Sequence, residues 1–532
     1  RRHLRLSQRG DAMTSARALD LAVILAYLVF MAWLGLRFSR RQTTTEDFFV
    51  AKRSMPSWAM GLSLLATLIS SVTFIAYPGS AYSKNWSNLV PGFLVLGVLL
   101  LVGSVIIPFY RHVVGMSAYE YFEKRFGRPA RVYASIAFTL AHFSKMGFVF
   151  YLMALTVNSI TGWSLDVVVC GVCAVMILYT VKGGIEAVIW TDVVQAFITW
   201  AGVIVVLCFL LFLPPGGPSA VFQLASEQHK FSLGDMRWDY TSATIPVLLV
   251  YGFFWYLQRY TADQTVVQRY LVAKSDRGAL KGVALGAVLC VPIWALFMLI
   301  GTCTWAFYQL TGEHLPAYVT KADQVFPHFI ATHLPAGFAG LFMASLMGAS
   351  MTMLASDLNC LAAVGVEDFY RALRPQATDR QRLRMARILI IVVGVLSAAT
   401  ALILAHAKGN ALSMWFAVSA IVSGGLAGLF LLAFLSRRAN PRGVYIGIAA
   451  SILCTIWAVL TNRRIVDLGP LNYHGDDLTI GALGHMVLWS VGYAASLLFR
   501  RGTDQQQDMT VWAWVRGRKA REAQPLVPDR HA

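Results

Sequence analysis

The sequence predicts an all-α protein embedded in a membrane, on the evidence of its composition, its long apolar segments and the placement of its basic residues. Of its 532 residues, 57% are hydrophobic and only 14% are charged, an apolar balance outside the range of soluble proteins. The formal net charge of +18 would by itself suggest a nucleic-acid partner. The positions of the charges give a different explanation.

About 13 apolar segments are long enough to cross the hydrocarbon core of a bilayer. We interpret each as one transmembrane helix. Their bounds are approximately 19–36, 57–82, 89–110, 132–160, 165–181, 186–213, 241–258, 282–308, 335–363, 388–407, 411–436, 443–461 and 479–499.

The basic residues fall mainly on one side of these segments. If the N-terminus lies outside, most of the 45 Lys and Arg residues occupy inner connections, as in the cluster 371–387 and in the tail after 500. Cytoplasmic loops carry such an excess of positive charge. We therefore expect a multi-pass protein of a bacterial-type inner membrane, with a cytoplasmic C-terminus and no nucleic-acid partner.

The segment 57–82 contains a weak turn. Residues 66–73 read ATLISSVT, and Pro78 and Gly79 follow. A helix in lipid must satisfy its own backbone groups, so an interruption there is tolerated only beside a cavity or a binding site. One alternative is an unbroken helix in which Ser and Thr bond back to carbonyls of the preceding turn.

Other patterns exclude several classes of protein. The chain has no Walker-type phosphate loop, which argues against a primary pump. All seven cysteines lie in apolar segments, and Cys170 and Cys173 have neither a nearby His nor a second pair, so we interpret them as packing residues. No connection is long enough to fold as a separate domain.

Four motifs together resemble the sodium/solute symporter family, which includes sodium/glucose, sodium/proline and sodium/sialic acid carriers. They are YEYFEKRFG at 119–127, GGIEAVIWTDVVQ at 183–195, DQTVVQRYLVAKS at 263–275 and ASMTMLASDLN at 349–359. The resemblance implies the leucine-transporter-like fold: two inverted repeats of five helices, with the second and seventh segments broken at mid-membrane.

On this resemblance the chain divides into six parts. They are an extracytoplasmic segment 1–18, a peripheral helix 19–36, a first repeat 57–213, a second repeat 241–436, two peripheral helices 443–499 and a cytoplasmic tail 500–532.

The resemblance also implies a sodium site. Backbone carbonyls of Ala66, Ile69 and Ala349 and the hydroxyl of Thr352 match four of its ligands. A fifth ligand, usually a hydroxyl, falls on Met353. A thioether is a poor ligand for a hard cation, so this site has lost one oxygen.

A second ion or proton site is implied at Asp192 and Ser356. In some relatives the acidic residue of the WTDxxQ motif joins hydroxyls of the ninth segment, although one of those positions here is Ala355. A structural alternative is that Asp192 braces neighbouring helices. Asp357 either contributes to an ion or proton site or faces a solvated cytoplasmic vestibule.

The expected substrate site contains Ser70, Thr73 and Lys145. Lys145 is the one basic residue inside a predicted span, and His142 lies one turn before it. Asp263 and Phe416 match further substrate positions, but the hydrogen-bonding set of galactose-type carriers is mostly absent. This favours a small organic anion over a neutral sugar. Alternatively, Lys145 pairs with Asp192 or another acid, or extends its ammonium toward a membrane interface.

We therefore expect a secondary-active importer, not an enzyme, that couples sodium to a sugar acid or monocarboxylate by alternating access. It needs no organic cofactor, and its partners are the solute and the lipid bilayer, as a monomer or weak homo-oligomer. The alternatives are a proton-coupled or sodium-independent carrier, with a sugar as a possible substrate, and a membrane sensor.

Overall fold

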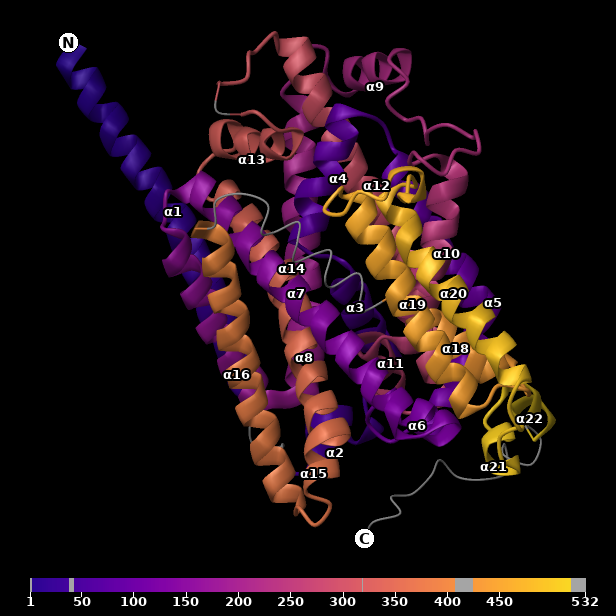
Figure 1. Cartoon of the computed structure of the whole chain (residues 1–532). Coiled ribbons are helices and arrows are strands. Elements are labelled where there is room, and N and C mark those ends of the chain that lie inside the picture. The colour runs from indigo at the N-terminus through magenta and orange to yellow at the C-terminus, as the bar shows by residue number, and fades with distance from the viewer. Residues whose placement is uncertain (1, 38–42, 318, 407–423, 518–532) are drawn as a thin grey trace.

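The computed structural model describes residues 2–37, 43–317, 319–406 and 424–517, and within these ranges it is helical, with one isolated bridge between Met55 and Ala273. Most helices run along one long axis of the molecule (Figure 1). The α-helices are α1 (Arg2–Arg37), α2 (Thr45–Val50), α3 (Ser57–Leu68), α4 (Ser71–Ser83), α5 (Val90–Val113), α6 (Glu120–Phe126), α7 (Arg128–Thr161), α8 (Leu165–Phe212), α9 (Gly217–Glu227), α10 (Ile245–Ala262), α11 (Gln264–Val272), α12 (Asp276–Thr311), α13 (Ala322–His333), α14 (Phe338–Val364), α15 (Arg371–Leu373), α16 (Asp379–His406), α18 (Leu426–Leu435), α19 (Pro441–Asn462), α20 (Asp477–Leu497), α21 (Asp504–Gln507) and α22 (Val511–Arg516).

Within the described residues, nine helices are long and apolar enough to cross a membrane, or ten if the bent pair α3 and α4 forms one span. This confirms an all-α, multi-pass membrane protein. The predicted segment 411–436 lies largely outside the described residues, so the expected total of 13 stays a prediction. Helix α1 runs through the expected boundary at residue 18 without interruption.

The predicted break at 66–73 is confirmed, and the alternative of an unbroken helix is wrong. Helix α3 ends at Leu68, Ile69 and Ser70 have extended backbones, and α4 begins at Ser71. The two halves are bent by 56°. The break leaves carbonyls at the end of α3 and N–H groups at the start of α4 without intrahelical partners. Such ends favour cations and anions, respectively.

A second break separates α10 from α11. Asp263 has an extended backbone (φ −98°, ψ 114°), and its carboxylate accepts a hydrogen bond of 2.8 Å from the Thr265 N–H. It therefore caps the N-terminus of α11. The predicted segment 241–258 ended too early, because α10 continues to Ala262.

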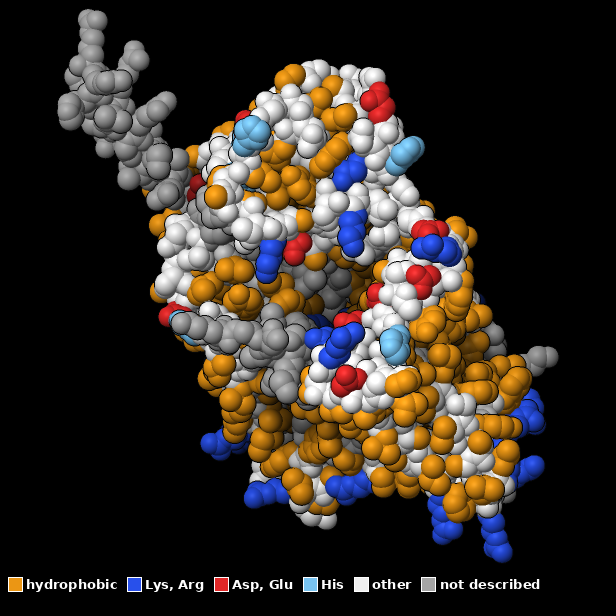
Figure 2. Space-filling view, turned by 45° about the horizontal axis from the view of Figure 1, so that its top comes forward, with side chains coloured by type: hydrophobic (Ala, Val, Ile, Leu, Met, Phe, Trp, Pro, Cys, Tyr) orange, Lys and Arg blue, Asp and Glu red, His pale blue; other side chains and the backbone are white. Residues whose placement is uncertain are grey.

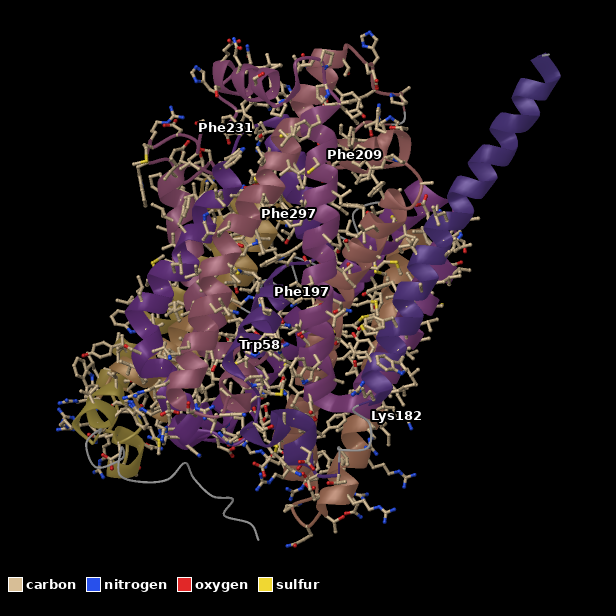
Figure 3. The ribbon with its side chains drawn as sticks, turned by 180° about the vertical axis from the view of Figure 1, so that it is seen from behind. Trp58, Lys182, Phe197, Phe209, Phe231 and Phe297 are labelled. Carbon is tan, nitrogen blue, oxygen red and sulfur yellow. The ribbon has the colours of Figure 1, made fainter. Side chains whose placement is uncertain are left out.

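Helix α8 contains two predicted spans. Its 48 residues would extend about 72 Å if straight, more than twice the ~30 Å hydrocarbon core. At Gly184 the backbone leaves the helical region with φ 56° and ψ −153°, a conformation that glycine tolerates best. Figure 3 shows Lys182 near one end of the molecule, with Phe197 and Phe209 progressively nearer the other. The two parts of α8, before and after Gly184, match the predicted segments 165–181 and 186–213.

Helix α14 is the central helix of the bundle. In the most apolar 18-residue stretch of this span, 89% of the residues are buried. The corresponding share in the spanning part of α1 is 22%. It packs against α1, α3, α7, α8 and α16. Polar side chains on any face of α14 are therefore inside the protein.

Figure 1 shows α9 and α13 at one end of the molecule, the α9 end, and α6, α15 and α22 at the opposite end, the α15 end. Many Lys and Arg side chains project from the rim of the α15 end, below an apolar surface (Figure 2). Arg111, Arg125 and Arg269 differ from this pattern because they are at most 1% exposed. They are internal hydrogen-bond donors, although all three fall between the predicted spanning segments.

Candidate functional site

A small cavity brings together all four residues of the expected sodium site. Ala66 and Ile69 flank the end of α3, and Ala349 and Thr352 lie one turn apart on α14. The cavity measures about 10 Å³, roughly the space of one water-sized sphere. It therefore suits a dehydrated ion better than an organic solute.

The Thr352 hydroxyl is oriented by α8. It donates a hydrogen bond to Gln195 Oε1, whose amide donates in turn to the Tyr27 hydroxyl at 3.0 Å. Because its proton is committed to Gln195, the Thr352 oxygen can offer lone pairs to a cation. Gln195, the last residue of the GGIEAVIWTDVVQ motif, also lines the cavity.

Asp192 and Ser356, predicted for a second ion or proton site, are also brought together, but a guanidinium lies between them. Arg269 Nη2 is 3.4 Å from Asp192 Oδ2 and donates to Ser356 Oγ at 2.5 Å. The same nitrogen donates to Ser63 and Thr67 at 3.3 and 3.2 Å. All five side chains are at most 3% exposed, so Arg269 supplies the positive charge that balances Asp192.

One carboxylate oxygen of Asp192 accepts no hydrogen bond from the described residues. Asp192 Oδ2 accepts hydrogen bonds from Ser63 and Arg269, but the buried Oδ1 has none among the described residues. A buried carboxylate oxygen without a partner is costly. It is therefore a suitable additional ligand for a small cation.

Lys145 forms an ion pair with an acid, as one of the two sequence-based interpretations proposed. The acid is Asp357, with Lys145 Nζ 2.9 Å from its Oδ2, and not Asp192. His142 Nδ1 lies 2.8 Å from Asp357 Oδ1. Asp357 is fully buried, so its interpretation as a residue of a solvated vestibule is wrong. The Lys145 side chain is 26% exposed, whereas the Asp357 side chain is 0% exposed.

Asp263 joins the same cluster from the break between α10 and α11. Its carboxylate is ion-paired with Arg259 and lies 3.3 Å from His142 Nε2. The Arg259 guanidinium also lies over the Trp255 ring, 5.1 Å from its centroid. The predicted substrate residues Lys145 and Asp263 are thus connected through His142.

Ser70 and Thr73 lie at the break between α3 and α4. The Thr73 hydroxyl accepts a hydrogen bond from the Ser70 N–H at 3.3 Å, and both side chains are less than 10% exposed. Ser71 connects this turn to α7 by donating to the Val149 carbonyl at 3.4 Å. Phe416 lies outside the described residues.

Sequence reasoning missed Arg259 and Arg269 as site residues because it assigned both to an inner basic connection. Arg259 and Asp263 are four residues apart, a spacing at which opposite charges on a helix often pair. That spacing was the available signal for Arg259. Nothing local distinguished Arg269, because all of its acceptors except the Thr265 carbonyl are distant in sequence.

Comparisons with known proteins agree with this geometry. The model of the Sodium:solute symporter family matches residues 48–450. The Sodium/sialic acid symporter NanT of Aliivibrio fischeri is 33% identical over 497 residues, covering 92% of this chain and 95% of the relative. The Sodium/sialic acid symporter SiaT of Proteus mirabilis is 33% identical over 486 residues, covering 90% and 95%.

A solved structure of a Na⁺-coupled sialic acid symporter, in a substrate-bound outward-open state, has the same fold. It superposes with a TM-score of 0.84 at 32% identity and covers 91% of this chain and 99% of its own. The family match extends over most of the sequence and includes α3, α4, α7, α8, α10, α11 and α14, which build the cavity and both ion clusters. The chain belongs to the sodium:solute symporter family.

Proposed function

We propose that this protein imports a sialic-acid-like sugar acid together with sodium ions. The observation that carries the proposal is the cavity where the α3–α4 break meets Ala349 and Thr352 on α14. Sodium is a transported co-substrate here. Because the cavity joins residues from two separate helices, an ion bound in it would hold the broken helix against α14.

The proposed anchor for the solute is Lys145. Its side chain is partly exposed, whereas its partner Asp357 is fully enclosed. An incoming carboxylate would therefore meet the ammonium without displacing Asp357 into water. Ser70 and Thr73, at the N-terminal end of α4, are proposed to contact the same solute, and the helix end favours negative charge there.

The proposed architecture has two inverted repeats, residues 57–213 and 241–436, with broken helices at α3–α4 and α10–α11. Both breaks contribute to the clusters described above, which supports pairing them as equivalent elements. The basic rim at the α15 end supports placing that end in the cytoplasm and the α9 end outside. On this orientation the N-terminus is outside and the C-terminus is inside.

The test is binding of radiolabelled N-acetylneuraminate, a sialic acid, to purified protein in sodium or potassium at two pH values. We expect sodium-dependent binding that weakens at least about tenfold in Lys145→Ala, the effect of losing one charge-assisted contact. Lys145→Arg keeps the charge and is expected to retain most of the affinity.

Thr352→Val and Thr352→Ser test the ion site in the same assay. The first removes the oxygen and is expected to raise the half-saturating sodium concentration about tenfold or more, whereas the second keeps it. Binding that ignores sodium and follows pH would overturn sodium coupling in favour of a proton. Binding of neutral sugars alone would overturn the role of Lys145.

A further inference from the structure

A surface pocket at the α15 end, the interfacial pocket, lies where several helices end. It measures about 600 Å³ and is lined by the last residue of α18, the turn after it, α20 and α22. Helix α18 ends at Leu435, α19 begins at Pro441 and α20 ends at Leu497. Helices α19 and α20 are long and apolar enough to cross a membrane. Because spanning helices end near the edge of the hydrocarbon core, the pocket lies at the boundary between lipid and water.

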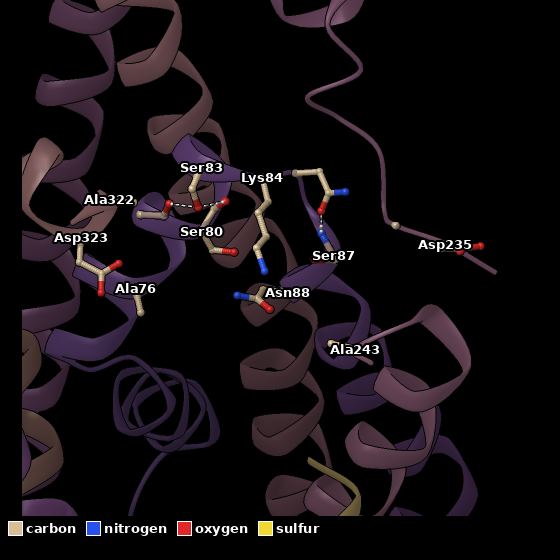
Figure 4. A pocket seen from close by; sticks show the side chains of 13 residues that line it. Ala76, Ser80, Ser83, Lys84, Ser87, Asn88, Asp235, Ala243, Ala322 and Asp323 are labelled. Atoms are coloured by element: carbon tan, nitrogen blue, oxygen red, sulfur yellow. Dashed lines mark hydrogen bonds between the residues drawn. The ribbon is translucent and has the colours of Figure 1, made fainter. Parts of the chain in front are cut away.

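The interfacial pocket differs in charge from a pocket at the α9 end. The pocket at the α9 end contains Lys84 together with Asp235 and Asp323, so its lining carries both signs (Figure 4). The interfacial pocket is lined by Arg437 and Arg438 and by no acidic residue among those described. Figure 2 shows Lys and Arg side chains along the rim of the same end. The interfacial pocket therefore favours a negatively charged ligand.

The two arginines of the pocket have no internal counter-charge. Among the described residues, Arg437 forms no ion pair, and its guanidinium lies 5.4 Å from the centroid of the Trp512 ring. Arg438 Nη2 donates to the carbonyls of Leu497 and Phe499 at 3.0 and 2.9 Å, whereas its Nη1 has no acceptor in the described part of the chain. Guanidinium groups form strong, often bidentate hydrogen bonds with phosphate oxygens, so a phosphate group suits this wall.

An aromatic surface extends from the arginines toward the middle of the membrane. Trp489 and Tyr493 lie four residues apart on α20 and therefore on one face of it. Their rings are stacked, with centroids 5.9 Å and planes 9° apart, and the two residues are 42% and 38% exposed. From Trp489 to the end of α20 the helix rises about 12 Å. The exposed rings therefore reach the level of the acyl chains.

Helix α22 holds a third aromatic side chain of the pocket in place. Trp512 Nε1 donates to the Leu435 carbonyl at 2.6 Å, which joins α22 to the end of α18. Trp514 is buried and packs against Phe109 and His112 of α5, with ring centroids 5.4 and 5.5 Å apart. Trp512 remains 48% exposed. The wall is therefore formed before a ligand arrives, which lowers the entropy cost of binding.

The combination of charge and apolar surface fits a lipid better than a soluble anion. Tryptophan and tyrosine concentrate at membrane interfaces, and basic pockets between spanning helices bind anionic headgroups. A free phosphate would contact the arginines and leave the rings of α20 uncovered. Residues 518–532, which follow α22 in the sequence, include four Lys or Arg and two Asp or Glu, so that segment does not supply the missing negative charge.

We propose that the interfacial pocket binds one anionic phospholipid of the surrounding bilayer. Its phosphate lies against Arg437 and Arg438, and one of its acyl chains lies along Trp489 and Tyr493. The bound lipid connects the end of α18 with α20 and α22, and it stabilises the packing of these helices. Binding of this lipid is independent of the transported solute and of sodium.

The experiment titrates the purified full-length protein in a neutral detergent with dioleoyl phosphatidylglycerol and counts bound lipids by native mass spectrometry. We expect one tightly bound lipid. Dioleoyl phosphatidylcholine has the same acyl chains without net charge and is expected to bind at least about tenfold more weakly. Arg437→Gln is expected to weaken binding of phosphatidylglycerol about tenfold, whereas Arg437→Lys keeps the charge and should keep part of the affinity.

The matched control is Arg380→Gln. Arg380 is exposed near the start of α16, across the α15 end from α22 (Figure 1). The substitution removes the same charge from the same rim and is expected to leave the affinity for phosphatidylglycerol at the wild-type value. Equal losses in Arg437→Gln and Arg380→Gln would show a general effect of surface charge and overturn the site.

Melting temperatures with each lipid and with inorganic phosphate give a second measurement. Phosphatidylglycerol should raise the melting temperature of the wild type and of Arg380→Gln more than that of Arg437→Gln. Equal affinity for the two lipids overturns the site, and so does stabilisation by inorganic phosphate as large as that by phosphatidylglycerol, which indicates a soluble ligand. None of these outcomes depends on the solute, so the proposed function is tested separately.

Discussion

Two buried charge clusters contact α14 at adjacent residues, Ser356 and Asp357. They differ in how far their charged side chains are exposed to solvent. Ser356 faces the Arg269–Asp192 cluster, in which both charged side chains are 0% exposed. Asp357 faces the Lys145 cluster, in which the lysine is 26% exposed. Neighbouring residues on a helix point about 100° apart, so one helix can hold a closed cluster and an open one.

The difference indicates separate roles. The closed cluster balances its charge internally, and its Asp192 Oδ1 accepts no hydrogen bond from the residues that the structure describes, a property suited to a small ion. The open cluster contains Lys145, whose side chain is partly exposed and which is the proposed anchor for a larger anion. Because the two clusters share α14, an ion and a solute can both act on the position of this helix.

The largest effect is expected from breaking the closed cluster. Asp192→Asn leaves the Arg269 guanidinium buried without a carboxylate, which typically costs about 3–5 kcal/mol. We expect a clear fall in melting temperature at a fixed heating rate. In the double variant Asp192→Asn with Arg269→Met, no buried charge is left, and much of the loss should be recovered. A wild-type melting temperature in Asp192→Asn alone would contradict a closed, charge-balanced cluster.

A smaller effect is expected from the matching change in the open cluster. Asp357→Asn removes the partner of a lysine that already reaches solvent, so we expect a loss of about 1–3 kcal/mol in the free energy of unfolding. Because the internal carboxylate no longer competes for Lys145, binding of the sugar acid should become severalfold tighter. Weaker binding in an equilibrium assay would show that Asp357 positions the ammonium for the solute.

The smallest effect is expected from Ser356→Ala. Arg269 keeps its contacts with Asp192, Ser63 and Thr67, so losing one acceptor should cost only about 1 kcal/mol. The control is Ser350→Ala on the same helix, because among the described residues the Ser350 hydroxyl bonds to just one group, the Leu346 carbonyl one turn earlier. Equal melting temperatures for the two variants would mean that the bond between Ser356 and Arg269 contributes little.

Much of the fold followed from local patterns in the sequence. The lengths of the apolar segments predicted the spanning helices. The hydroxyl-rich turn at 66–73 allowed either a broken or an unbroken helix, and the family resemblance favoured the break between α3 and α4. The four motifs predicted the family, and the resemblance in turn implied the set Ala66, Ile69, Ala349 and Thr352, which the structure brings together around one small cavity. These features depend on segment length and on neighbours within one helical turn, so the chain itself contains the signal.

The pairing of charges depended on the tertiary structure. Helix α14 is apolar and small-residue-rich on every face, so its sequence does not show that Ser356 turns toward Arg269 while Asp357 turns toward Lys145. The partners come from α7, α8 and α11, and the packing of these helices sets which groups meet. Composition and segment length therefore determined a multi-pass helical protein, and the motifs added its family and its two broken spans. Helix packing decided which buried charged side chains are fully enclosed and which are partly exposed.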